Sequence, residues 1–376
     1  RFVASGLPAL LVCPAYLWWI MCCAALHALA LVLLPLGFKK EYGLATRHIM
    51  TLIHRPLVYL FEYSDSRIYL YSNADVDKDI LGTLASNQSM IFLNHRGDLD
   101  WLVGLLVQDN GGGLGACKAI IKKQLLYLPF FGMSWWCSDF ISISRDWKSD
   151  NKKLEKGYKR QHEYREHAIP YCLTIFPEGT RLTPEKLLDS QEFLRSRKLP
   201  VFQNVLCPRV KGFWSAVNGT LLDTVYDTTI VAGATTPQGN VLSLAQGKPA
   251  EFHLYMERVD PKDIPKEEEP LNKWLMSKWE IKEGKLERFH KEGHLGGDRG
   301  TAGRRQLTVR ASARNTVIGA VLWWVISCLG FVRFCVMLGF YKLLFGIVLG
   351  TVLMITLVGA IMQQVHFKHS EAPKKS

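Results

Sequence analysis

The stretch I-F-L-N-H-R-G-D-L-D-W, Ile91–Trp101, predicts a strand that ends in a polar turn and continues as a helix. Met90–Leu93 is a short apolar run, which is typical of a buried strand. Leu99–Val107 is a second apolar run, and we expect a helix there with an aspartate near its N-terminus, where carboxylates are favoured. The polar residues between the two runs are therefore held on a strand-to-helix turn.

His95 and Asp100 are the candidate catalytic residues of this turn. Asp100 follows His95 by five residues, so the turn can fold the carboxylate back towards the imidazole. An imidazole that is held by a carboxylate is a poised general base. Taken alone, such a pair is more often a helix cap beside a surface histidine, and a second motif is needed to favour catalysis.

The second motif also begins at the end of a predicted strand. Tyr171–Phe176 is apolar and runs directly into the sequence P-E-G-T-R. Such a turn offers backbone N–H groups, a hydroxyl and a guanidinium, which together suit a phosphate. Thr180 and Arg181 are the candidates for direct phosphate contact, and Gly179 allows close backbone approach. Glu178 would repel a phosphate, so we expect it to orient Arg181 or the backbone of the turn.

These motifs, N-H-R-G-D-L-D and F-P-E-G-T-R, lie in this order about 80 residues apart and resemble those of the glycerolipid acyltransferase family. Asn204–Phe213, N-V-L-C-P-R-V-K-G-F, is similar to a segment of the plant and algal 1-acyl-sn-glycerol-3-phosphate (lysophosphatidic acid) acyltransferases. The resemblance covers roughly residues 45–290. It implies an α/β fold, in which a mixed sheet is flanked by helices and the site lies in a cleft at the strand ends.

The resemblance also implies the reaction, which is transfer of an acyl chain from acyl-CoA to the sn-2 hydroxyl of lysophosphatidic acid to give phosphatidic acid. His95 would take the proton of the acceptor hydroxyl, and Asp100 would orient the imidazole. The substrate's own hydroxyl replaces the serine of a hydrolase triad, so no acyl-enzyme is required. The thiol of coenzyme A leaves easily, so we expect neither a metal nor a cofactor, with acyl-CoA as a co-substrate.

Arg145 and Lys211 are two further candidates for substrate binding. In the family an arginine closes another motif, between the two described above, and helps to hold the acceptor's phosphate, and the resemblance assigns this role to Arg145. The family's usual glycine six positions earlier is Asp139 here, which departs from the pattern. Arg209 and Lys211 follow the strand-breaking Pro208, and they could touch an anionic head group or only solvent.

Other functions stay open beside this one. The acceptor could be another lysophospholipid, such as lysophosphatidylinositol or lysocardiolipin, or the chain could be a non-enzymatic lipid-binding membrane protein on the same fold. The intact set of His95, Asp100, Glu178 and Arg181 argues against the non-enzymatic alternative. A serine hydrolase is not supported, because the sequence has no G-x-S-x-G elbow.

Long apolar segments near both ends predict a membrane protein. Leu7–Phe38 is nearly free of charge and could span the bilayer once or form a re-entrant hairpin, with Pro14 and Pro35 breaking or kinking its helix. Thr316–Val332 and Val336–Met362 predict two more spans. The expected organisation is a membrane segment over 1–38, an acyltransferase domain over 39–292, a basic Gly/Arg linker over 293–315, two transmembrane helices over 316–363, and a cytosolic tail over 364–376.

Charge and cysteines agree with a membrane-bound, cytosol-facing enzyme. The formal net charge is +12, which suits nucleic acid or an anionic membrane surface, and no nucleic-acid fold signature is present. Basic residues next to the apolar segments predict that the catalytic domain faces the cytosol, and a lysine-rich tail resembling a dilysine retrieval signal suggests the endoplasmic reticulum. The nine cysteines form neither a disulfide framework nor a zinc motif. Because the first residue is Arg1, we expect the true N-terminus to be missing.

Overall fold

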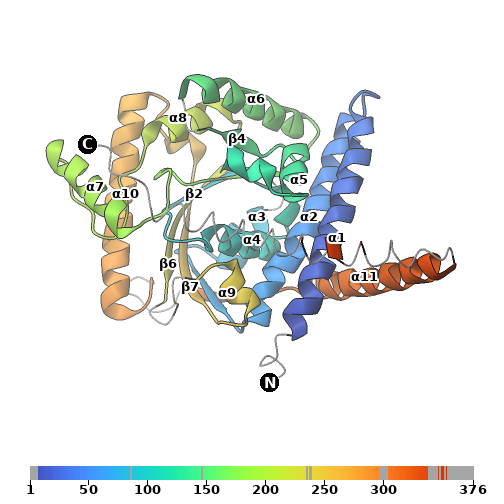
Figure 1. Ribbon diagram of the computed structural model, residues 1–376. Helices are drawn as coiled ribbons and strands as arrows, with labels where there is room; N and C mark the ends of the chain where they lie inside the picture. The colour runs from blue at the N-terminus through green and yellow to red at the C-terminus, as the bar shows by residue number, and fades with distance from the viewer. Residues whose placement is uncertain are drawn as a thin grey trace, which may run out of the picture. The chain divides into compact units, whose positions relative to one another are not determined.

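A computed structural model describes residues 7–84, 87–144, 147–233, 236, 239–295 and 304–337, together with 346, 349–350 and 353. The chain divides into two compact units, one containing residues 20–317 and the other containing residues 5–19 and 318–376. The first unit carries both of the predicted motifs, and its centre is a β-sheet (Figure 1).

In the described part of the chain the sheet has eight strands in the order β4-β3-β5-β2-β6-β7-β1-β8. The five strands from β4 to β6 are parallel to one another. Strand β7 is antiparallel to β6 and parallel to β1, and β8 is antiparallel to β1, so the sheet is mixed as predicted. The strands are β1 Arg67–Tyr71, β2 Gln88–Leu93, β3 Cys117–Lys122, β4 Ile141–Ile143, β5 Tyr171–Ile175, β6 Thr224–Ala232, β7 Glu251–Val259 and β8 Arg304–Leu307.

Strand β2 lies inside the sheet and is buried on both faces, which explains why its run is apolar without alternation. On one face Met90 and Phe92 belong to a core to which α6, α8 and α10 contribute. Helix α4 begins directly after the turn that follows β2, and helix α2 packs against it (Figure 1). The helices of the first unit are α2 Lys39–Tyr63, α3 Gly82–Leu84, α4 Asp100–Asn110, α5 Phe131–Cys137, α6 Trp147–Glu166, α7 Pro184–Ser196, α8 Val210–Gly219, α9 Val241–Ala245 and α10 Glu268–Glu292.

Two strands of the sheet had no clear signal in the sequence. Strand β3 has the sequence C-K-A-I-I-K, in which a lysine stands on each side of a short apolar run. Strand β8 has the sequence R-R-Q-L. Residues 304–307 were expected in the basic linker, and the structure corrects this, because they pair with β1 at the edge of the sheet. The other proposed domain boundaries stay predictions.

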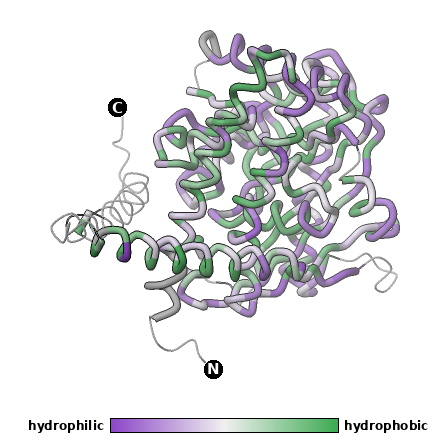
Figure 2. The backbone as a smooth tube through the Cα atoms, turned by 90° about the vertical axis from the view of Figure 1, so that its right-hand side faces the viewer, coloured by the Kyte–Doolittle hydropathy of each residue, from purple (hydrophilic) through white to green (hydrophobic). Residues whose placement is uncertain are grey.

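Among the described residues two helices are long and apolar enough to cross a membrane, and they lie near the two ends of the chain as expected. They are α1, Leu7–Ala30, with a candidate span at Pro14–Leu33, and α11, Ala311–Met337, with a candidate span at Ala311–Phe334. Pro14 is accommodated inside α1 rather than ending it. Figure 2 shows α11 as predominantly hydrophobic along its coloured length. Most of the second C-terminal span expected at 336–362, and the tail at 364–376, lie outside the described residues.

Candidate active site

The two motifs meet because β2 and β5 are parallel neighbours, so both strands end at the same edge of the sheet. Asn94, the first residue after β2, fixes the start of the polar turn against β6. Its side-chain amide donates to the backbone oxygen of Ile230 and its side-chain oxygen accepts from the Ile230 N–H, both at 2.9 Å. The residue that follows, His95, is therefore held in a defined place at the sheet edge.

His95 and Asp100 are in contact, as their spacing predicts. His95 Nδ1 lies 2.8 Å from Asp100 Oδ2. The same carboxylate oxygen accepts the backbone N–H groups of Arg96 at 2.6 Å and Gly97 at 2.9 Å, so the turn wraps around it. The Asp100 side chain is fully buried, whereas that of His95 is 23% exposed. None of the described residues hydrogen-bonds to His95 Nε2, so this atom can meet a substrate hydroxyl.

The backbone of His95 is bound to the second motif on both sides. Its N–H donates to Glu178 Oε2 at 3.3 Å, and its carbonyl accepts from the N–H of Leu182 at 2.8 Å. Its ring stacks on that of Phe176, with 4.2 Å between the ring centroids. The histidine is thus positioned by its own turn and by the turn after β5.

Glu178 is buried, and its role differs from the predicted one. Its Oε1 accepts from the indole N–H of Trp279 on α10 at 3.2 Å, and its Oε2 accepts from His95. Among the described residues these are its hydrogen-bond donors, so the carboxyl fixes the His95 turn and not Arg181 or its own turn. Burial raises the pKa of Glu178 to about 8, which favours the neutral acid at neutral pH.

The turn after β5 has the expected glycine geometry and a cluster of cations. Gly179 has φ +70°, a left-handed conformation that glycine adopts without steric cost. Thr180 Oγ1 accepts from Lys186 Nζ at 2.6 Å. Arg181 forms an ion pair with Asp98 of the first motif, and both side chains are partly exposed. The predicted turn residues are therefore together beside the His95 turn.

Arg209 is a site residue whose role its sequence left open between a head group and solvent. Its backbone N–H donates to the carbonyl of Pro177 at 2.8 Å. Its Cδ lies 3.6 Å from the point where a β-carbon on Gly179 would be, so its side chain passes over the glycine turn. Its signal in the sequence was its place in the Asn204–Phe213 segment, two residues before Lys211.

The other predicted binding residues are less closely tied to the turn. Lys211 is exposed on the first turn of α8, two residues beyond Arg209. Arg145 lies outside the described residues, so its assignment stays a prediction. The Asn204–Phe213 segment itself contacts the first motif, because the Arg96 guanidinium donates to the carbonyl of Asn204 at 3.1 Å.

A carboxylate-oriented imidazole beside a basic glycine turn defines a site for general-base catalysis on an anionic substrate. A family model described as Acyltransferase matches residues 76–230, which include both turns, and one described as Acyltransferase C-terminus matches residues 243–323. The chain belongs to this acyltransferase family.

Curated relatives agree with this assignment. The chain is 33% identical over 254 residues to 1-acyl-sn-glycerol-3-phosphate acyltransferase 3 of Arabidopsis thaliana, which covers 67% of this chain and 66% of the relative. It is 29% identical over 312 residues to 1-acyl-sn-glycerol-3-phosphate acyltransferase 2 of Brassica napus, covering 82% and 76%. It is 31% identical over 239 residues to the human 1-acyl-sn-glycerol-3-phosphate acyltransferase gamma, covering 62% and 61%.

Proposed function

We propose that this protein transfers an acyl chain from acyl-CoA to the sn-2 hydroxyl of lysophosphatidic acid, which gives phosphatidic acid and free coenzyme A. The observation that carries the proposal is the 2.8 Å contact between His95 Nδ1 and the buried Asp100. This contact leaves Nε2 as the atom that can receive a proton. The names of the relatives above support lysophosphatidic acid as the acceptor.

The proposed reaction uses the acceptor hydroxyl as the nucleophile. As its oxygen attacks the thioester carbonyl, its proton passes to His95 Nε2, and Asp100 stabilises the imidazolium. Collapse of the tetrahedral intermediate breaks the C–S bond, and the imidazolium returns the proton to the departing thiolate. The products are a new ester and a free thiol, and this scheme balances without a metal ion or a cofactor.

In this scheme the turn after β5 holds the acceptor's phosphate. Gly179 allows the backbone to approach it, and the hydroxyl of Thr180 and the guanidinium of Arg181 are the direct contacts. The side chain of Arg209 over Gly179 adds a further cation at this place. The phosphate would thus lie next to the turn that carries His95, which suits a hydroxyl two carbon atoms away from it.

Purified membranes containing the full chain test this function. We expect radiolabelled acyl-CoA to label phosphatidic acid when lysophosphatidic acid is supplied, and we expect weaker or no labelling with lysophosphatidylinositol or lysocardiolipin. If one of those two is acylated in preference, that lipid is the acceptor, and the proposed acyl-transfer chemistry still holds. Absence of transfer to every acceptor in the panel would contradict the function.

We further propose that the protein resides in the endoplasmic reticulum membrane with its catalytic domain in the cytosol. The two apolar helices and the lysines that begin α2, Lys39 and Lys40, support this orientation. A cysteine introduced for Ser370, on a background without exposed native cysteines, should react with an impermeant thiol reagent in sealed, cytosol-side-out vesicles. Reaction only after detergent would contradict the orientation.

A further inference from the structure

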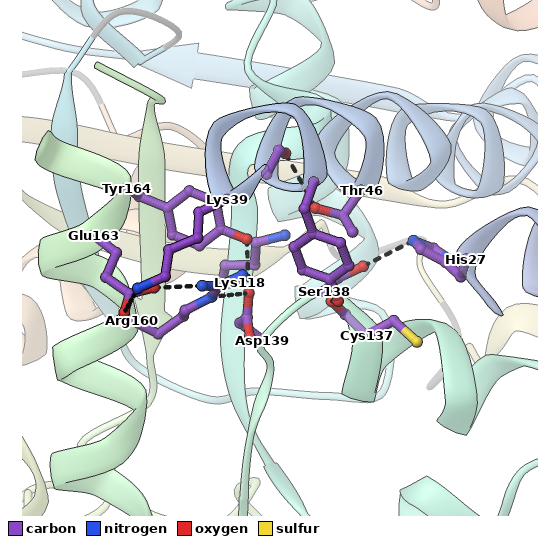
Figure 3. A network of polar contacts seen from close by, with 12 residues as sticks. His27, Lys39, Thr46, Lys118, Cys137, Ser138, Asp139, Arg160, Glu163 and Tyr164 are labelled. Carbon is purple, nitrogen blue, oxygen red and sulfur yellow. Dashed lines mark hydrogen bonds and ion pairs between the residues drawn. The ribbon is translucent and has the colours of Figure 1, made fainter. Parts of the chain in front are cut away.

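A buried histidine in the N-terminal apolar helix connects that helix to α5. His27 is fully buried, and its Nδ1 lies 3.2 Å from the hydroxyl of Ser134. Its Nε2 lies 3.2 Å from the hydroxyl of Ser138 (Figure 3). The hydroxyl of Tyr42 on α2 also donates to the carbonyl of Cys137 at 2.6 Å. Because polar groups in an apolar span are costly unless they are paired, these contacts fix α5 against α1.

The position of His27 in its helix gives the depth of α5. His27 precedes Leu33, the end of the candidate span, by six residues. With the rises of an α-helix and of the short 3₁₀ turn after Ala30, this corresponds to about 10 Å along the helix axis. Helices that lie in the plane of a membrane bury their apolar face by about 5–10 Å. If α1 spans the bilayer, α5 therefore lies at the boundary between head groups and acyl chains.

The side chains around α5 are those that favour this boundary. Tyr127 in the turn before α5 is 74% exposed, and Trp136 on α5 is 61% exposed. Met133 is exposed beside them, and Leu29 of α1 is exposed as well. Tyrosine and tryptophan are the residues enriched at membrane interfaces, because one part of the ring is apolar and another is polar. An exposed apolar surface next to a membrane-spanning helix has lipid as its natural neighbour.

The segment is rigid enough to present these side chains together. A β-carbon on Gly132 would lie 1.9 Å from the carbonyl oxygen of Leu126, so α5 packs tightly on the preceding 3₁₀ helix, Lys123–Tyr127. This pair of helices connects β3 to β4, the two strands at one end of the sheet. A surface that is fixed at this place would hold one end of the catalytic sheet at the membrane.

We propose that residues 123–137, the docking segment, insert Tyr127, Met133 and Trp136 into the interfacial layer of the same leaflet that α1 enters at Leu33. The partner is the lipid bilayer itself, and the proposal is independent of the substrate. It follows from the His27 contacts, from the depth they give and from the exposed aromatic side chains. The docking segment is then a second, non-spanning contact of the enzyme with its membrane.

The test measures depth in the full chain. A nitroxide amino acid is introduced by codon suppression at Tyr127, at Trp136 and, as a polar control, at the exposed Glu287 on α10, and each variant is placed in phosphatidylcholine nanodiscs. Collision rates are compared for oxygen, which concentrates in lipid, and for a water-soluble nickel chelate. We expect oxygen to dominate at 127 and 136 and the nickel chelate to dominate at 287.

Nickel accessibility at 127 and 136 equal to that at 287 would overturn the proposal. A docking site for another protein predicts that result, because only lipid and the purified chain are present. If the variant at 136 does not fold, the label at Tyr127 decides alone, since a side chain that is 74% exposed contributes little packing. Folding of each variant is checked by its thermal unfolding midpoint, so that a misfolded sample is not counted.

Discussion

Glu178 Oε2 accepts the backbone N–H of His95 at 3.3 Å, across 83 positions of the sequence. This contact links the carboxyl of the second motif to the histidine of the first. Burial raises the pKa of Glu178 to about 8, so at neutral pH the group is mostly an uncharged acid. The His95 turn is thus held by a group whose charge depends on pH.

The raised pKa of Glu178 makes the stability depend on pH in a defined direction. Below pH 4.5, the ordinary pKa of a glutamate, Glu178 is protonated in both the folded and the unfolded chain. In this range its ionisation takes nothing from the free energy of unfolding. As the pH rises from 4.5 to about 8, the unfolded chain ionises first, and the free energy of unfolding falls by roughly 1.4 kcal/mol per pH unit. Above pH 8 both states are ionised and the loss is complete.

Glu178→Gln should flatten this dependence. The amide does not titrate, so the thermal midpoint in detergent should decline less between pH 5 and pH 8 than that of the unchanged chain. One amide nitrogen cannot accept a hydrogen bond, so we expect a lower midpoint at pH 5. Parallel pH profiles for the two proteins would show that Glu178 does not titrate in this range.

Substitution of His95 or Asp100, the proposed catalytic pair, should abolish or severely lower transfer without unfolding the chain. His95→Ala should remove acyl transfer, because it removes the imidazole that would take the proton. No other described side chain contacts Asp100 Oδ2 and could serve as the base instead. Asp100→Asn should lower kcat by about 10⁴-fold, as expected when the ring loses its orienting carboxylate. The readout is turnover of acyl-CoA in the presence of lysophosphatidic acid. Turnover of His95→Ala near that of the unchanged enzyme would refute the mechanism.

Arg181→Lys should weaken binding of the acceptor more than binding of acyl-CoA. Lysine keeps the charge but loses the guanidinium fork, and each lost charge-assisted hydrogen bond costs roughly 1.5–3 kcal/mol, or about 10- to 150-fold. We expect this loss of affinity to appear as a higher KM for lysophosphatidic acid. The matched control is Asp98→Asn, which breaks the Arg181–Asp98 ion pair while keeping the guanidinium. A control that raises the acceptor KM as much as Arg181→Lys would show that the ion pair, and not phosphate contact, matters.

Asp139 stands where the family has a glycine, and the structure shows what each residue type would do there. Its φ is +61°, which suits glycine, and its Oδ2 accepts from Arg160 Nε at 3.1 Å and from the Tyr164 hydroxyl at 2.7 Å (Figure 3). Asp139→Ala should lower the free energy of unfolding by about 2 kcal/mol, because it removes the hydrogen bonds from Arg160 and Tyr164 while Arg160 keeps its ion pair with Glu163. Thermal unfolding measures the loss.

Two companion variants separate the causes of that loss. Asp139→Gly removes the same contacts but relieves the left-handed backbone, so it should be about 1 kcal/mol more stable than Asp139→Ala. Asp139→Asn keeps two hydrogen-bonding atoms, so its free energy of unfolding should fall least of the three variants. Equal midpoints for the alanine and glycine variants would mean that backbone strain at this position is negligible.

The sequence predicted the elements whose signals are local. Strand β2 and helix α4 follow from two apolar runs, and the His95–Asp100 contact follows from a spacing of five across a turn. Short-range patterns sufficed in these cases, because each element is buried or turned by its own residues.

The remaining features depend on partners far away in the chain. Trp279 reaches Glu178 from 101 positions away, and no pattern near either residue signals the contact. Helix α2 includes Pro56, which in a sequence argues for an interruption. Arg209 looks like any surface cation until the fold places it over Gly179. Tertiary packing decides such features, so a single sequence does not reveal them.

The pairing of β8 with β1 has a practical consequence for making a fragment of this enzyme. A fragment cut at residue 292, where the sequence suggests that the catalytic domain ends, would leave β1 without its neighbour on one side. An open strand edge invites pairing between molecules and hence aggregation. The same holds on the ribosome, where the sheet stays incomplete until residues 304–307 have emerged. A fragment for crystallisation should therefore extend to Arg310, whose guanidinium also donates to the carbonyl of Asp109 at 3.0 Å.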